Sequence, residues 1–201
     1  MANVSERRRV DERRTQLVDA AITVLARDGL AGSTTRQITR EAGLALGAFH
    51  YAFVSKSDLL RAVIERYADN IADVLRSTIT TEIDDLTVFA RHVLEGYWSV
   101  IEDTPNLQLA QYELTVYALR QPELRDLADL QYQRLADAVE QVLDHVPTIS
   151  PGQQRTDFAR FITATMDGLV LQYLIEGDKA AARRRLDLYV HTMPALADLA
   201  E

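Results

Sequence analysis

The chain has 201 residues, 47% of them apolar, so it can bury a core of its own. It contains no Cys and no apolar run of the roughly 18–20 residues that cross a bilayer, which excludes disulfides and Cys-ligated metals and favours a cytoplasmic protein without a membrane partner. The net charge is −8, but residues 1–60 hold 9 Lys and Arg against 7 Asp and Glu, whereas residues 61–201 hold 13 against 23, which indicates two parts with different roles.

The first elements follow from apolar spacing and from helix caps. Residues 1–10 predict a flexible basic arm, whose Arg7, Arg8 and Arg9 are better explained as a solvated tail than as minor-groove contacts. From Asp11 onward apolar residues recur at helical spacing as far as Gly29, a residue type that commonly ends helices. The sequence therefore predicts a first helix over 11–29.

Two short helices are expected next. Thr34 is the predicted N-cap of a helix over 35–42, Gly43 supplies the turn, and a further helix covers 45–52. Ser55 and Asp58 form a pattern like a capping box at the start of a fourth helix, which extends to about residue 80.

Longer helices fill the rest of the chain. They are expected over 85–103, 105–120, 122–146, 152–176 and 179–199, with breaks at Pro105, Pro122, Pro147, Pro151 and Gly177. No stretch alternates apolar and polar residues with the period of two that a strand requires. The predicted fold class is all-α.

The run from Arg13 to Leu60 contains several signals at fixed offsets. In order they are an apolar helix ending in Gly29, Thr34 before Ile38, Ala42-Gly43, Gly47, Phe53, Ser55-Lys56 and Leu59-Leu60. Two short helices joined by a glycine turn behind a supporting helix are typical of a helix-turn-helix. The whole run closely resembles the DNA-binding domain of the tetracycline-repressor (TetR) family.

The resemblance implies a homodimer whose third helices enter successive major grooves of a near-palindromic, double-stranded operator, and whose second domain binds a small-molecule effector that releases the DNA. We therefore expect residues 11–60 to bind DNA and residues 61–201 to bind the ligand and the second subunit. Repression is favoured over activation because it is the commoner role in the family. The candidate DNA-binding residues are Thr34, Thr35, Arg36, Gln37, Ala45, Gly47, Ala48, His50, Tyr51 and Lys56.

Within this set, Arg36 offers two donors to the O6 and N7 atoms of guanine, and Lys56 resembles the phosphate-binding Lys of the family. Ser, Lys and Tyr are frequent in the family at the positions that Ala45, Leu46 and His50 occupy here. We therefore expect the third helix to act mostly by apolar contact, with Ala45 or Ala48 against thymine methyl groups. Arg36 is expected to contribute more to discrimination than any side chain of the third helix.

Other interpretations of this segment remain open. Phe49 and Phe53 are expected in the core, since Phe is usually buried. Tyr51 and His50 have either a DNA-facing or a packing role. Arg13 and Arg14 either contact phosphates or are simply solvated.

A mix of polar and aromatic residues between about 85 and 145 favours a ligand pocket. The candidate ligand-binding residues are Trp98, Tyr112, Glu113, Tyr117, Met166 and Gln172. Aromatic residues at helical spacing are also typical of a core, and Glu113 could pair with an Arg instead. His92 and Glu95 lie three residues apart, but without further ligands we expect neither a metal site nor a cofactor.

Residues 156–176 of the helix expected over 152–176 are apolar on nearly every side, which indicates burial on more than one side. We interpret it as the main dimer helix, with the last helix as its partner in a four-helix bundle. The candidate interface residues are Phe158, Phe161, Ile162, Leu169, Tyr173, Leu186, Tyr189 and Met193; Ala164 and Gly168 would allow close approach. The alternative is a helix that is central within the monomer.

Enzyme motifs are lacking: the sequence has no Gly-rich phosphate loop, nucleophile elbow or His-Glu-x-x-His. The expected function is a DNA-binding regulator, and the alternative is a helical ligand-sensing or interaction module that does not bind DNA.

Overall fold

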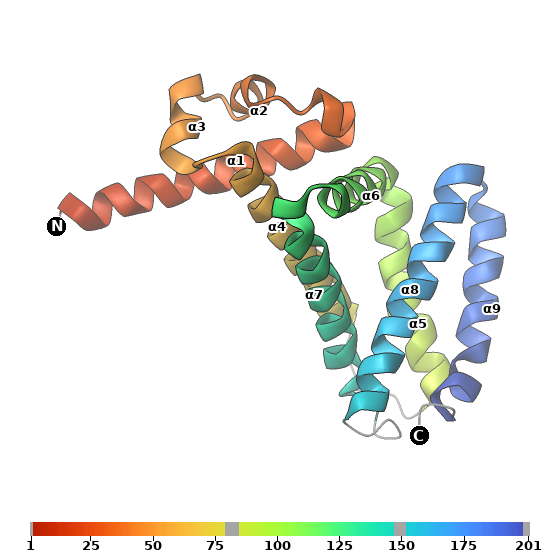
Figure 1. Cartoon of the computed structure of the whole chain (residues 1–201). Coiled ribbons are helices and arrows are strands. Elements are labelled where there is room, and N and C mark those ends of the chain that lie inside the picture. The colour runs from red at the N-terminus through yellow and green to blue at the C-terminus, as the bar shows by residue number, and fades with distance from the viewer. Residues whose placement is uncertain (1, 79–84, 147–151, 199–201) are drawn as a thin grey trace. The chain divides into compact units, whose positions relative to one another are not determined.

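The computed structural model describes residues 2–78, 85–146 and 152–198, and within these ranges every regular element is a helix (Figure 1). The predicted all-α class is therefore confirmed. The chain divides into two compact units, Met1–Tyr67 with Asn106–Gln131, and Ala68–Pro105 with Tyr132–Glu201. None of the helices in the described ranges is long and apolar enough to span a membrane.

The first unit begins with α1 (Ala2–Gly32) and contains α2 (Thr35–Glu41), α3 (Leu46–Ala52) and the start of α4 (Lys56–Thr78). The segment 106–131 adds α6 (Pro105–Arg120), the 3-10 turn η1 (Pro122–Leu124) and the start of α7 (Arg125–Leu143).

The core of this unit follows the predicted apolar stripe. Leu17 and Leu25 of α1 pack with Ile38 of α2, Phe49 of α3 and Leu59 of α4, and all five are almost fully buried. Phe53 is buried as well, so the expectation that both Phe residues lie in the core is confirmed. Gly43 forms the turn between α2 and α3 at φ 66°, a backbone region that glycine occupies without strain.

Residues 2–10, expected as an irregular arm, form the first turns of α1. No Gly or Pro interrupts this stretch, and Arg8 bonds Glu12 one turn later at 3.0 Å, a pairing that supports an exposed helix. At the other end Gly29 departs from helical geometry at φ 68°, as expected of a helix end, but one further turn continues to Gly32. Each helix boundary predicted from a cap or a Gly therefore lies within a few residues of the observed one.

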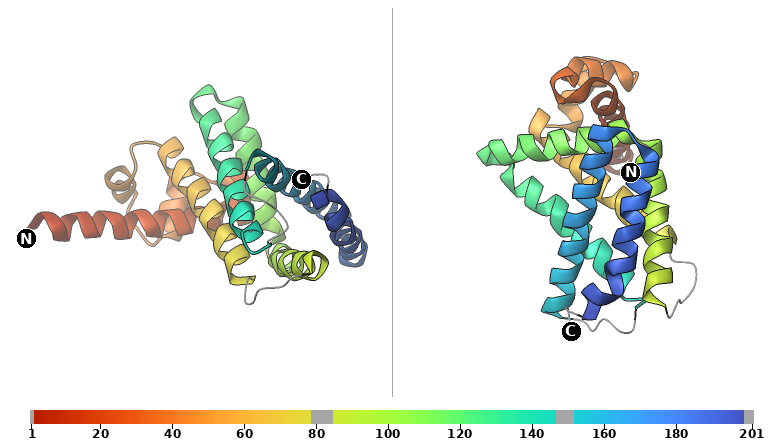
Figure 2. Two further views of the ribbon diagram at one scale, coloured as in Figure 1. Left: turned by 90° about the horizontal axis from the view of Figure 1, so that it is seen from below. Right: turned by 90° about the vertical axis from the view of Figure 1, so that its right-hand side faces the viewer.

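The second unit contains α5 (Leu86–Asp103), α8 (Gln153–Glu176), α9 (Lys179–Asp198) and the remainders of α4 and α7. In this unit α9 lies against both α5 and α8, and Figure 2 shows the three side by side. Gly177 ends α8 in the left-handed conformation, as its position in the sequence predicted. The helix expected over 122–146 is instead η1 followed by α7, which ends at Leu143. Pro147, Pro151 and the last residues of the predicted fourth helix lie outside the described residues.

Candidate DNA-binding surface and ligand cavity

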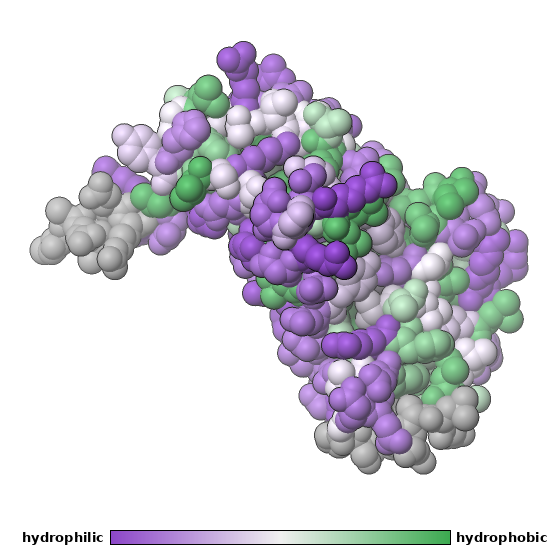
Figure 3. Space-filling view, viewed as in Figure 1, coloured by the Kyte–Doolittle hydropathy of each residue, from purple (hydrophilic) through white to green (hydrophobic). Residues whose placement is uncertain are grey.

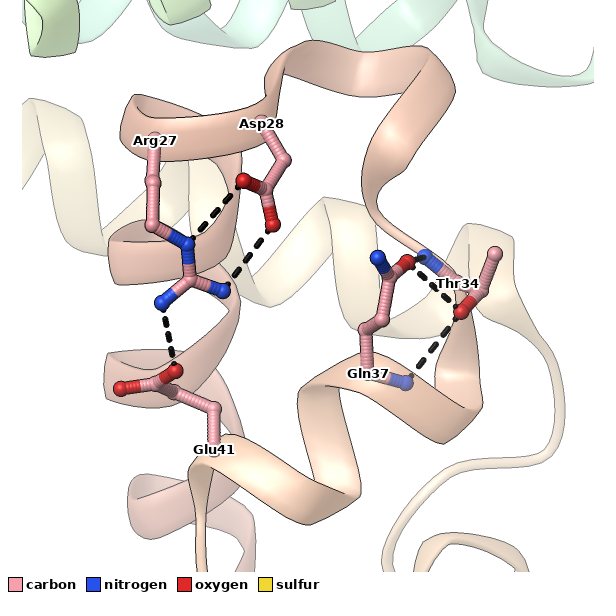
Figure 4. A network of polar contacts seen from close by, with 5 residues as sticks. All are labelled: Arg27, Asp28, Thr34, Gln37 and Glu41. Atoms are coloured by element: carbon pink, nitrogen blue, oxygen red, sulfur yellow. Dashed lines mark hydrogen bonds and ion pairs between the residues drawn. The ribbon is translucent and has the colours of Figure 1, made fainter.

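A capping box begins α2. The backbone N–H of Gln37 donates to the Thr34 hydroxyl at 3.2 Å, and the Gln37 side-chain oxygen accepts from the Thr34 backbone N–H at 3.2 Å (Figure 4). These bonds satisfy two backbone donors that a helix start would otherwise leave without partners. Thr34 is thus the N-cap that the sequence predicted, while Gln37 is engaged in the cap.

An ion-pair network fixes the orientation of α2 against α1. Arg27 pairs with Glu41 at 2.8 Å and with its neighbour Asp28 at 2.9 Å (Figure 4). The hydrogen bond to Asp28, followed by the one to Glu41, raises the pKa of Arg27 above its ordinary value. The network leaves Arg36 and Arg40 exposed on α2.

The third helix presents an exposed surface of unusual composition. Phe49 and Ala52 face the core, Ala48 is half-buried, and the exposed positions are Ala45, Leu46, Gly47, His50 and Tyr51. Tyr51 is 76% exposed, which excludes the packing role that the sequence left open for it. Ala45 is the N-cap residue of α3 and provides no side-chain bond. An exposed Leu46 was not among the candidates, although its position between Ala45 and Gly47 could have indicated it.

Arg14 is not simply solvated, which was one of the two roles left open for it. Its guanidinium donates to the carbonyl oxygen of Ala52 at 2.9 Å and to Asp58 at 3.2 Å, and it lies 4.2 Å from the centre of the Phe53 ring. Arg14 therefore joins α1 to the end of α3 and the start of α4. It helps to fix the orientation in which α3 is presented.

Asp58 and Ser55 begin α4. The Ser55 hydroxyl accepts from the backbone N–H of Asp58 at 3.1 Å, whereas the Asp58 carboxylate accepts from the N–H of Val54 at 3.2 Å, one residue earlier than a capping box would place it. Burial disfavours the ionised carboxylate of Asp58, but the bonds from Arg14 and Val54 outweigh it and hold its pKa below the ordinary value.

A groove within the first unit is lined by several residues that the sequence assigned to DNA binding or to the ligand pocket. Lys56, the end of α1 and α6 enclose it, and Tyr112, Glu113 and Tyr117 are among its lining residues. The Glu113 carboxylate accepts from the backbone N–H of Leu30 at 2.7 Å, just past the irregular Gly29. Partial burial lowers the pKa of Lys56. Glu113 therefore supports the end of α1, a role that was not among those expected for it.

The other ligand candidates lie in the second unit. Trp98 is fully buried, donates to Glu102 at 3.0 Å and packs against Tyr173. Met166 lines a cavity enclosed by α4, α5, α7 and α8, while Gln172 is exposed on α8. The six candidates are therefore not brought together: three belong to each unit.

Tyr97, Thr163 and Asp167 line the same cavity and were not among the candidates. The signal for Asp167 was present, because it is the one charged residue of the sequence between Phe161 and Ile175.

The outer face of α8 is apolar and exposed. Phe161, Leu171 and Ile175 are 47%, 44% and 69% exposed, and Ala164 and Gly168 share their face of the helix. Apolar surface over this part of the unit is visible in Figure 3. Phe158, Ile162, Tyr173, Leu186, Tyr189 and Met193, expected at the interface, are instead buried within the unit, and Leu169 is half-buried. Because the helix is apolar on every side, its sequence did not show which stripe packs inward.

The geometry in the first unit is that of a helix-turn-helix DNA-binding protein: a capped α2, a glycine turn and an exposed α3, held by buried contacts to α1 and α4. Sequence models of known families match both parts of the chain. "Bacterial regulatory proteins, tetR family" matches residues 17–63, and "Tetracyclin repressor-like, C-terminal domain" matches residues 81–193.

Individual relatives agree with the family models. The nicotine-responsive transcriptional repressor HdnoR of Paenarthrobacter nicotinovorans is 31% identical over 82% of this chain and 85% of its own length. The multidrug-binding protein EbrR, solved with imidazole, is 30% identical with a TM-score of 0.62, over 87% of this chain and 92% of its own. A regulator from Rhodococcus sp. Rha1, at 19% identity and a TM-score of 0.72 over 89% and 94% of the two chains, shares the fold.

The chain belongs to the TetR family. It is a DNA-binding transcriptional regulator, and this family consists of regulators rather than enzymes.

Proposed function

We propose that the chain is a homodimeric repressor that binds a near-palindromic operator through the Thr34–Lys56 segment and leaves it when a small molecule occupies the second unit. The observation that carries the proposal is the exposed α3, whose His50 and Tyr51 side chains are open to solvent while Phe49 packs into the core. Arg36 of α2 is exposed as well. Operator binding takes place where the chromosome lies, so we place the protein in the cytoplasm.

The composition of α3 supports a division of labour in DNA binding. Ala45, Leu46 and Ala48 offer methyl groups and no hydrogen-bond donors, so they suit the methyl group of thymine. Arg36 offers the paired donors that distinguish guanine. Arg36 therefore contributes more to base discrimination than any side chain of α3.

A second copy of the chain is the proposed partner of the outer face of α8. Phe161, Leu171 and Ile175 would gain burial there, and Gly168 has open space where a Cβ would stand, which permits a close helix crossing. Leu188 of α9, 68% exposed, is a further apolar side chain that could be buried by a second copy. Two helices from each subunit would then form a four-helix bundle about a two-fold axis.

The effector site is proposed in the cavity of the second unit. HdnoR is described as nicotine-responsive and EbrR as multidrug-binding, so relatives of this chain respond to or bind small molecules. Ile71 and Leu75 of α4 line the cavity, and α4 begins at Lys56 in the DNA-binding unit. A ligand that displaces this helix would act on both units through the chain itself.

The DNA-binding proposal is tested with duplex DNA from upstream of the gene for this protein. The affinity is measured by fluorescence anisotropy across a range of salt concentrations, for the wild type, Arg36→Ala and His50→Ala. We expect tight binding with a log–log salt slope of about −0.9 for each phosphate contacted. Arg36→Ala is expected to lose about 1–3 kcal/mol of discrimination against a substituted site, more than His50→Ala.

Arg76→Ala is the control, because it removes the same charge from an exposed pair with Asp73 in the second unit. It should leave operator affinity unchanged. A larger loss of specificity in His50→Ala would reverse the ranking of the two residues. Absence of binding at low salt would instead favour a helical module that senses ligands without contacting DNA.

A further inference from the structure

The cavity of the second unit that Met166 lines is apolar on most of its wall. Ile71 and Leu75 of α4, Leu94 of α5 and Leu135 and Val139 of α7 are among its lining residues. Its volume is about 40 Å³, and a second cavity of about 40 Å³ shares Leu75, Leu94, Val139 and Ile162 with it. Because these four side chains line both spaces, the two cavities adjoin, and a displacement of the shared side chains would join them into one apolar site.

One charged side chain, Asp167 of α8, lies on this wall. It is half-buried and hydrogen bonds with the hydroxyl of Tyr132 of α7, while Tyr97 of α5 lines the same cavity. Burial, followed by the negative charge of Asp167, raises the pKa of both Tyr97 and Tyr132 above the ordinary value. Both phenols keep their protons at neutral pH, and Tyr132 orients the carboxylate by donating to it.

A carboxylate beside an apolar cavity favours some ligands and disfavours others. Moving a charge out of water costs free energy unless an opposite charge or hydrogen bonds compensate it. An anion brought into this cavity would be repelled by Asp167, whereas a cation would be attracted by the carboxylate and by the face of an adjacent phenol ring. The other residues that line the two described cavities are uncharged, so they do not reverse this preference.

We propose that the effector is an organic cation: a substituted ammonium group against Asp167 and the ring of Tyr97, with an apolar body that enters the adjoining space beside Phe89. This proposal rests on the proposed function only in that the bound molecule acts as an effector. The carboxylate selects the charge of the ligand, and the leucine, valine and isoleucine side chains accept its hydrocarbon part.

The test uses three probes with one body and different charge: phenylbutylamine, phenylbutanol and phenylbutyrate. Binding of each to the full chain is measured by isothermal titration calorimetry at neutral pH, for the wild type and for Asp167→Asn. We expect the wild type to bind the protonated amine most tightly and the carboxylate most weakly. Asp167→Asn should weaken the amine at least about tenfold and leave the alcohol nearly unchanged.

Asp157→Asn is the matched control, because Asp157 lies on the same helix, is exposed, and does not line the cavity. It removes the same charge and should preserve the preference for the amine. Tyr132→Phe retains the ring and removes the donor to Asp167, so a smaller loss of amine affinity is expected. If Asp167→Asn does not fold, the order of the three probes on the wild type decides the question.

Equal affinity for amine and alcohol, or an amine affinity that Asp167→Asn leaves unchanged, overturns the proposal; Asp167 would then serve the packing of α8 against α7. Operator binding is measured separately on the same wild-type protein. A chain that selects the amine through Asp167 but never binds DNA would contradict the proposed function while leaving the cation site in place. A chain that binds DNA but does not prefer the amine would contradict the cation site while leaving the proposed function in place.

Discussion

Arg14 stabilises the DNA-binding unit through contacts within the protein. Its position in the basic first part of a DNA-binding domain suggests a phosphate contact. In the structure Arg14 hydrogen bonds to Ala52 and Asp58 and lies over the ring of Phe53. Hydrogen bonds to charged groups of this kind contribute about 1.5–3 kcal/mol when buried and less when partly exposed. The sequence alone could not separate these roles, because the partners lie 38 and 44 residues away along the chain.

The carboxylate of Asp58 makes the stability of the DNA-binding unit depend on pH. Its folded-state pKa lies below the value of about 3.9 for an unfolded chain, so its stabilisation is complete above that value and is lost as the pH falls through the folded pKa. We expect Asp58→Asn to lower the free energy of unfolding at pH 7 by about 1 kcal/mol, after allowing for partial exposure, and to reduce the further loss as the pH falls below about 4.

Urea unfolding followed by circular dichroism at each pH measures this difference. Asp11→Asn, which changes an exposed carboxylate on α1, controls for the loss of a surface charge. A pH dependence that is identical in Asp58→Asn and the wild type would show that the Arg14 and Val54 contacts do not stabilise the ionised form.

At the scale of elements, the sequence predicted helices best where a cap or a breaker marks the end. Thr34 and Ser55 cap the starts of α2 and α4 and Gly177 ends α8, as predicted, because these signals depend only on neighbouring residues. The start of α1 and the split between η1 and α7 were missed, since no strong breaker or cap marks them. The buried stripe of α8 was also misassigned, because Phe158 and Phe161 are equally apolar and only tertiary packing distinguishes the buried one from the exposed one.

The residues of the DNA-binding surface and of the ligand site were likewise predicted only in part. The sequence left His50 and Tyr51 open between a DNA-facing and a packing role, and the structure shows both exposed, while the burial of Phe49 and Phe53 was predicted. The division of Tyr112 and Trp98 between two units depends on contacts between distant segments and left no local signal.

The capping box of α2 should be measurable by itself. Thr34→Ala removes the hydroxyl that accepts from the Gln37 N–H, and we expect it to lower the free energy of unfolding by about 1 kcal/mol and to weaken operator binding. Thr34→Ser keeps the hydroxyl and should retain nearly all of both quantities. Equal losses in the two variants would attribute the effect to the methyl group rather than to the cap. Urea unfolding and fluorescence anisotropy provide the measurements.

At the scale of the whole molecule, DNA binding and subunit association are expected to be linked. A single short recognition helix contacts few base pairs, so a dimer that engages two half-sites gains affinity because the second contact becomes intramolecular. The exposed α8 face, in which Leu171 lies between Phe161 and Ile175 in the sequence, is the surface proposed to hold the two copies together.

Leu171→Arg tests this link. A charge within an apolar interface would be desolvated without a partner, so we expect the variant to be monomeric at micromolar concentration and to bind the operator at least about tenfold more weakly. Leu119→Arg is the matched control, because Leu119 is similarly exposed, at 47%, but lies on α6 of the first unit. Analytical ultracentrifugation gives the mass and anisotropy the affinity. A Leu171→Arg protein that remained dimeric would assign the interface to another surface, and a monomer with wild-type affinity would separate operator binding from association.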